Sequence, residues 1–271
     1  MTRAILLLFL RKELSDLRSN KQVWPAYWLL PIVAVALPLI LLIALPALTD
    51  SARAGNDAGA RMILETVLTD PSLRGVTVEE RLARLLLREI PLFYLLMPVI
   101  LASSAAALAL VREKEQRTLE PILATPLRDR DLMLAKLIAA VVPALLVTWA
   151  AALVGISAGM LGSMWRVGQI ILPTTGNLVG LLLLAPAMAT VAALAGLRAS
   201  ARFTDVPGAM QFTGLVVVPL CLVLVAVIGR PAMRWPVAGL LGTVFLGALA
   251  LWLFHRNLRR FKREEILTKW R

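Results

Sequence analysis

The side chains best suited to chemistry gather in one charged segment of the sequence, residues 112–131. Its glutamates are Glu113, Glu115 and Glu120, and basic residues are interspersed among them. Glu113 and Arg117 are four positions apart, a spacing at which opposite charges pair on one face of a helix. The segment also contains the residues of a small apolar face, Leu119, Ile122 and Leu123. This pattern predicts a short helix on the membrane surface that can transmit a push, because apolar runs adjoin it on both sides.

Catalytic chemistry has little support elsewhere in the sequence. His255 is the only histidine and Cys221 is the only cysteine, and neither adjoins a recognisable nucleophile motif. We find no carboxylate pair arranged for catalysis and no cluster of metal ligands, so we expect no catalytic or metal site, and we interpret His255 as an interfacial anchor. No glycine precedes a lysine, which excludes the glycine-rich loop that cradles the phosphates of ATP. We therefore expect no cofactor in this chain and no enzymatic activity of its own.

The composition points to lipid as the solvent. Of the 271 residues, 59% are hydrophobic and 17% are charged, whereas soluble domains are about half apolar and a quarter charged. The apolar residues lie in charge-free runs near or above the ~20 residues that a helix needs to cross a bilayer. The net charge of +12 comes from basic residues beside these runs, which indicates contact with anionic lipid headgroups rather than nucleic acid.

The sequence predicts an all-α integral membrane protein with six transmembrane helices in a single domain, 1–271. The predicted spans are 25–48, 91–111, 132–160, 172–197, 207–229 and 236–254. The remaining segments are an interfacial amphipathic helix at 1–22, an extracytoplasmic segment at 49–90 with helices near 58–69 and 77–90, the charged segment at 112–131, and a basic cytoplasmic tail at 255–271. We expect tilt, a kink or a re-entrant piece near Pro173, because the uncharged stretches beside Arg166 exceed one membrane thickness.

The distribution of basic residues predicts the orientation. With the N-terminus inside, 20 of the 29 Lys and Arg residues lie in the segments on the inner side and 9 on the outer side. In membrane proteins the loops on the cytoplasmic side carry an excess of Lys and Arg. We therefore expect a multi-pass protein of the inner membrane with both termini in the cytoplasm.

The charged segment resembles the signature of ABC-2 type permeases, the membrane subunits of type V ABC exporters. In that family a Glu-rich start, a Thr-Leu-Glu core and a Leu-x-x-Pro close lie between the second and third spans, ahead of a lysine that opens the third. The matching residues here are Glu113 and Glu115, Thr118-Leu119-Glu120, Leu123-Ala124-Thr125-Pro126, and Lys136. Arg117 departs from the pattern, since the family usually has glycine there. Two further places are similar to the family, Arg11-Lys12-Glu13-Leu14 and Arg198 through Gln211.

The resemblance implies a function for the charged segment. Residues 113–126 would be the coupling helix, which docks on a separate ATPase subunit that holds ATP and Mg. The residues that would make this contact are Glu113, Glu115, Thr118, Leu119, Glu120, Ile122 and Leu123. The family also implies two permease copies or relatives, and therefore a dimer. The alternative is a solvated charged loop beside the lipid.

The sequence indicates a substrate path less clearly than it indicates the coupling segment. The substrate class is open between lipid, drug, peptide and ion. The candidates are polar or amphipathic residues within the predicted spans: Thr148, Trp149, Ser157, Thr174, Thr175, Asn177 and Gln211. Interhelical hydrogen bonding is the alternative explanation for such residues. Two other functions are weighed: an ATPase-coupled assembly or scaffold subunit, and a secondary transporter. The second is disfavoured because no Asp or Glu lies deep within a predicted span. Residues 49–90 would cap the outer exit or meet a periplasmic partner.

Overall fold

The structure, a computed structural model of the chain, describes residues 11, 12, 15, 18, 19, 23–54, 59, 62, 65, 68, 69, 77–115, 129–203, 205–224 and 235–260. These residues form helices joined by turns and extended stretches, and they include no strand. The predicted all-α class is confirmed for this part of the chain.

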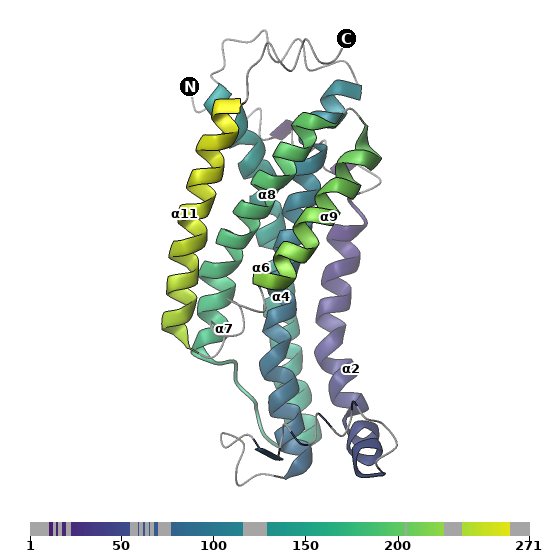
Figure 1. Cartoon of the computed structure of the whole chain (residues 1–271). Coiled ribbons are helices and arrows are strands. Elements are labelled where there is room, and N and C mark those ends of the chain that lie inside the picture. Colours follow the sequence, from purple (N-terminus) through teal and green to yellow (C-terminus); the bar gives the residue numbers. More distant parts are fainter. Residues whose placement is uncertain are drawn as a thin grey trace.

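The long helices stand side by side in an upright bundle (Figure 1). In chain order they are α2 (Ala26–Ala54), α4 (Val78–Glu115), α6 (Asp129–Val167), α7 (Thr175–Val179), α8 (Ala185–Arg202), α9 (Val206–Leu224) and α11 (Pro236–Arg260). A π-helical turn, Gly180–Leu184, joins α7 to α8, so these pieces form one continuous rod. We call the end of the bundle where α4 stops and α6 begins the motif end, and the opposite end the far end.

Five helices of the described chain are long and apolar enough to cross a membrane: α2, α4, α6, the rod from α7 through α8, and α11. Large apolar side chains point outward from them, as in Leu153, which is 72% exposed, and Leu241, which is 67% exposed. An exposed apolar surface of this kind suits contact with lipid. The chain is therefore a multi-span helical membrane protein. The described part of α9 ends at Leu224, so the fifth predicted span, 207–229, extends outside the described residues and stays a prediction.

α4 joins two elements that the sequence analysis separated. The predicted extracytoplasmic helix 77–90 and the predicted span 91–111 form one helix, Val78–Glu115. The sequence predicts a boundary at Pro91, but the helix runs through it. Membrane helices tolerate internal prolines because neighbouring groups satisfy the backbone carbonyls that proline leaves free. α4 therefore connects the two ends of the bundle without a break.

The third predicted span also has different limits. α6 exceeds the predicted range 132–160 at both ends. Asp129 and Asp131 in its first turn stabilise the N-terminus of the helix, because their negative charge lies at the positive end of the helix dipole. Gly168 follows α6 with a φ of 73°, a conformation that glycine adopts without strain. Residues 169–174 then run back along the bundle to α7 without helical structure, in place of a short turn at Arg166 (Figure 1).

Small residues allow α8 to approach α4 closely. A Cβ atom on Gly196 would lie 2.5 Å from the carbonyl oxygen of Ser103. The neighbouring side chains of Ala106 and Ala193 are fully buried. Close backbone approach over small residues is a common way for membrane helices to pack. α8 continues to Arg202, so it extends five residues beyond the predicted end of the fourth span at 197.

α6 approaches α2 over a second set of glycines. A Cβ atom on Gly162 would lie 2.8 Å from Cδ1 of Leu42 on α2, and one on Gly155 would overlap the hydroxyl of Tyr94. That hydroxyl donates a hydrogen bond to the carbonyl of Ala34 at 3.0 Å. Tyr94 of α4 thus holds α2 while Gly155 leaves room for its ring.

Candidate coupling site at the motif end

Two buried charges meet where α4 ends and α6 begins. Nζ of Lys136 on α6 donates hydrogen bonds to Oε1 of Glu113 on α4 and to the carbonyl of Ala109, each at 2.8 Å. The side chains of Lys136 and Glu113 are only 2% and 6% exposed. Removing one member of such a pair would leave a buried charge without its partner. The pair therefore fixes the end of α4 against α6.

Lys12, from the N-terminal segment, reaches the same carboxylate. Its Nζ donates to Oε1 of Glu113 at 3.0 Å, and its side chain is 41% exposed. Solvent weakens this contact relative to the buried one. Glu113 nevertheless connects three parts of the chain that are distant in sequence: the N-terminal segment, α4 and α6.

Lys114, the next residue of α4, caps the end of α8. Its Nζ donates to the carbonyl oxygens of Ser200 at 3.0 Å, Ala201 at 3.0 Å and Phe203 at 2.9 Å. The last carbonyls of a helix have no partner within the helix, and the helix dipole favours a positive charge beside them. The end of α8 is therefore stabilised by an ammonium that α4 supplies.

Ser200 makes a contact in the reverse direction, from α8 to α4. Its Oγ accepts hydrogen bonds from the backbone N–H groups of Leu110 at 2.8 Å and Val111 at 3.1 Å. Ser200 is fully buried. A side chain inserted into the hydrogen-bond ladder of a helix is a known cause of helix bending. The two helices thus exchange backbone contacts within their last turns.

We call these residues the motif-end cluster: Lys12, Glu113, Lys114, Lys136 and Ser200. The cluster holds helix ends together, and its chemistry is that of ion pairs and backbone caps. Within the described chain, no three His, Cys, Asp or Glu residues lie close enough to hold a metal ion. A displacement of the last turn of α4 would reach α6 through Lys136 and α8 through Lys114. The cluster is therefore suited to transmitting movement.

The structure places only some of the predicted coupling residues. Glu113 lies inside the bundle, where its partners come from this chain, rather than on a face open to an ATPase. Glu115 is the last residue of α4. The other predicted residues lie outside the described part of the chain: Thr118, Leu119, Glu120, Ile122 and Leu123.

Sequence reasoning missed most of the motif-end cluster. The i,i+4 rule paired Glu113 with Arg117, which lies outside the described residues, so that pair stays a prediction. The bond from Lys136 of the next helix could not be found by that rule. Lys136 was singled out only through the family resemblance. Lys114 stands between two glutamates in the sequence, which suggested a surface position. The sequence around Ser200, Arg198-Ala199-Ser200-Ala201-Arg202, gives no sign of its contact with α4.

The predicted substrate-path residues do not converge on one site. The hydroxyls of Thr148 and Ser157 bond to carbonyls of their own helix, those of Ala144 and Leu153. Asn177 is buried on α7, Gln211 is exposed on α9, and Trp149 lies on α6. Thr174 and Thr175 are exposed at the start of α7. Their role in transport stays a prediction.

Trp149 has a structural contact that the sequence did not reveal. Its indole Nε1–H donates to the carbonyl of Leu181, at 2.9 Å, in the π-helical turn. Within that turn the N–H of Ala185 bonds to the carbonyl of Gly180. The next N–H in this pattern would belong to Pro186, which has none. Trp149 supplies the donor that the proline cannot give.

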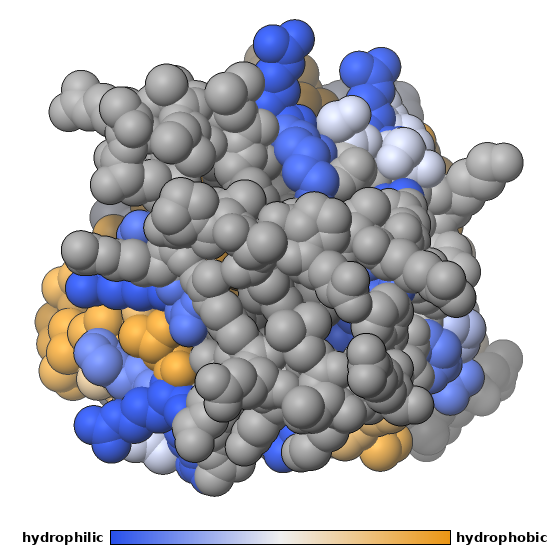
Figure 2. All heavy atoms as spheres, turned by 90° about the horizontal axis from the view of Figure 1, so that it is seen from above, coloured by the Kyte–Doolittle hydropathy of each residue, from blue (hydrophilic) through white to orange (hydrophobic). Residues whose placement is uncertain are grey.

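Seen from the motif end, the described surface shows hydrophilic side chains, with hydrophobic ones toward its edges (Figure 2).

Comparison with known proteins identifies the family of the chain. A search among curated proteins found no match. The family model described as "ABC-2 type transporter" matches residues 17–242, a range that contains α2, α4, α6, the rod through α8, and α9. The chain therefore belongs to the ABC-2 type transporter membrane-domain family.

Proposed function

We propose that this chain is the permease subunit of an exporter driven by a separate ATPase. The ATPase binds ATP and Mg, and docks on the charged segment through Glu120, Leu123 and their neighbours. Two permease copies, or this chain and a relative, form the membrane part. ATP binding draws the ATPase subunits together, and the resulting push enters the membrane through the charged segment.

The motif-end cluster carries this proposal. The charged segment leaves α4 two residues after Glu113 and returns to α6 seven residues before Lys136, and these two side chains bond directly. A force on the segment therefore acts on a clamped base. Lys114 extends this base to α8. Such an arrangement suits a lever better than a loose surface loop.

The test of coupling uses Glu120→Ala with Leu123→Ala in the permease reconstituted with its ATPase. We expect the ATPase to bind more weakly and its rate in the complex to fall to that of the isolated ATPase, while the permease still inserts in the membrane. The matched control is Glu79→Ala with Leu241→Ala, which removes the same chemical groups away from the motif end. Unchanged coupling in the test variant would contradict the proposal.

The same preparation separates an exporter from a scaffold subunit. Vesicles that contain the permease and its ATPase are loaded with candidate lipids, drugs, peptides or ions, and ATP-dependent movement is measured. ATP-dependent flux supports export. ATPase coupling without flux of any candidate would favour the scaffold, and flux without an ATPase would favour a secondary transporter.

The proposed orientation places both termini in the cytoplasm of a cell with an inner membrane. A cysteine at Thr77, in a Cys221→Ser background, should react with an impermeant reagent added to whole cells. A cysteine at Thr268 should react only after permeabilisation. The reverse pattern would place the charged segment on the outer surface, where no ATPase could reach it.

A further inference from the structure

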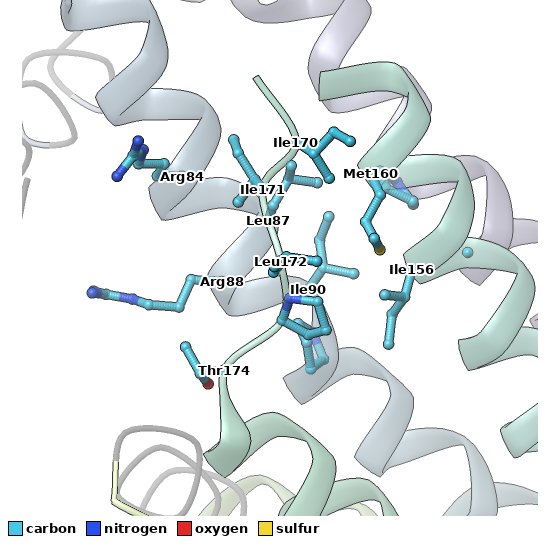
Figure 3. A pocket seen from close by; sticks show the side chains of 15 residues that line it. Arg84, Leu87, Arg88, Ile90, Ile156, Met160, Ile170, Ile171, Leu172 and Thr174 are labelled. Atoms are coloured by element: carbon cyan, nitrogen blue, oxygen red, sulfur yellow. The ribbon is translucent and has the colours of Figure 1, made fainter. Parts of the chain in front are cut away.

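A cavity of about 340 Å³ lies toward the far end, between α4 and α6, where the extended segment 169–174 crosses it. Apolar side chains from α4, α6 and the extended segment, together with Pro38 of α2, line most of its wall. Among them are Leu87, Ile156, Met160 and Leu172. Figure 3 shows the extended segment between the two helices, with its isoleucines close to Leu87. The motif-end cluster forms no part of its lining. Of the predicted substrate-path residues, Thr174 lines the cavity and the other six do not: Thr148, Trp149, Ser157, Thr175, Asn177 and Gln211.

One side of the cavity is basic. Arg84 and Arg88 both line it and stand one helical turn apart on α4. Figure 3 shows both side chains extending to the same side of α4, with Thr174 below them. Two guanidinium groups and a hydroxyl at this spacing suit an anionic group with several oxygen atoms, because guanidinium binds phosphate through paired N–H donors.

Glu80 and Gln169 hold the Arg84 side chain in place and leave one of its donors unused. Arg84 donates from Nη2 to Glu80 at 2.6 Å and to Gln169 at 3.0 Å. Its buried Nε has no hydrogen-bond partner among the described residues. The contact of Arg88 Nε with Glu89 is longer, at 3.8 Å. A buried donor without a partner is costly, so an additional acceptor at this place would stabilise the site.

The depth of the arginines in the bundle fits a headgroup. Arg88 precedes Arg112 by 24 positions on the same helix, which corresponds to about 36 Å at 1.5 Å per residue. A bilayer has a hydrocarbon core of about 30 Å and spans about 40–45 Å with its headgroups. With Arg112 in one headgroup layer, Arg88 therefore lies in the other.

We propose that this cavity binds an anionic phospholipid from the leaflet at the far end. The phosphate lies against Arg84 and Arg88, and one acyl chain follows the apolar wall between α4 and α6. The lipid fills the space beside the extended segment 169–174 and fastens it to both helices. This proposal needs only the membrane-embedded fold and is independent of the ATPase partner.

The test measures lipid binding by the purified full-length permease in detergent. Phosphatidylglycerol, phosphatidylcholine and glycerol phosphate are titrated separately, with native mass spectrometry and the midpoint of thermal unfolding as readouts. We expect phosphatidylglycerol alone to remain bound and to raise the midpoint. Since each charge-assisted hydrogen bond contributes about a tenfold step in affinity, Arg84→Gln with Arg88→Gln should weaken this binding about 100-fold.

The matched control is Arg81→Gln with Arg166→Gln, which removes the same charge from residues outside the cavity lining and should leave affinity within about threefold. A second variant, Ile156→Trp, keeps both arginines but fills the apolar part, and should also reduce phosphatidylglycerol binding. Equal binding of phosphatidylcholine, an equal effect of glycerol phosphate, or an equal loss in the control would each overturn the proposal. All of these results are obtained without the ATPase, so they are distinguishable from a failure of coupling.

Discussion

Glu113 and Lys136 lie 23 positions apart in the sequence and bond at 2.8 Å across the two helices that flank the charged segment. The segment between them therefore starts and ends on a fixed base. Because both side chains are almost fully buried, the bond is shielded from solvent. This relationship gives the charged segment the mechanical support that a coupling element requires.

Loss of Lys136 should destabilise the protein more than loss of Lys12. Lys136→Met leaves the Glu113 carboxylate buried without its main partner, and we expect a loss of about 3–5 kcal/mol in the free energy of unfolding. Replacing both members, as Glu113→Leu with Lys136→Met, should restore much of this loss. Lys12→Met, at the exposed contact, should cost about 1 kcal/mol or less. The free energy of unfolding in detergent is measured for the unchanged protein and the three variants. Equal losses of stability for Lys136→Met and Lys12→Met would contradict the structure.

Ser200→Ala should loosen α4 at one defined place. It removes the acceptor for the N–H groups of Leu110 and Val111, at a cost of about 1 kcal/mol. Hydrogen exchange at these two amides should accelerate relative to the rest of α4. Ser157→Ala is the matched control, since that hydroxyl is exposed and bonds only to Leu153 of its own helix among the contacts described. Unchanged exchange at Leu110 and Val111 would exclude the contact.

Gly196→Ala should separate α4 from α8. The added methyl group would lie 2.5 Å from a backbone oxygen, that of Ser103, and a backbone atom cannot move aside as a flexible side chain can. We expect a loss of about 1–3 kcal/mol in unfolding free energy, as for other overpacked sites. Gly247→Ala has open space around it and should be neutral or slightly stabilising, because alanine favours helix. A thermal unfolding series in detergent compares the two.

Trp149→Phe should destabilise the π-helical turn. It keeps an aromatic ring but removes the N–H that bonds to Leu181, which leaves a buried carbonyl unpaired at a cost of about 1–3 kcal/mol. Pro186→Ala restores a backbone N–H next to that carbonyl. We therefore expect the double variant to be more stable than Trp149→Phe alone. A double variant that is no more stable would show that Pro186 does not cause the dependence on Trp149.

The sequence was sufficient for the membrane class, the helical fold and the family. Runs such as 25–48 and 236–254 are long and free of charge, and lipid is the solvent that favours them. The family signature from Glu113 to Pro126 was also visible, because its spacing is local. These features depend on composition and on neighbours along the chain, so the order of residues determines them.

The helix boundaries expected at Pro91 and Arg198 are absent from the structure, because packing against neighbouring helices lets α4 and α8 continue through these positions. Pro91 ends helices in water, but within α4 the packed bundle lets the helix continue through it. The fourth predicted span ends at 197, just before Arg198, yet α8 extends to Arg202, and Lys114 of α4 caps its end. In both cases a neighbouring helix decides where the element ends.

Local order along the chain therefore determined that this protein crosses a membrane as helices and carries a charged segment between two of them. Only the tertiary structure decided that Glu113 faces inward to Lys136, that Ser200 binds the backbone of α4, and that Arg84 and Arg88 border an apolar cavity. These contacts join residues that are 23 to 90 positions apart or that belong to different helices. Helix packing sets such pairings, and a periodic pattern within one helix does not contain them.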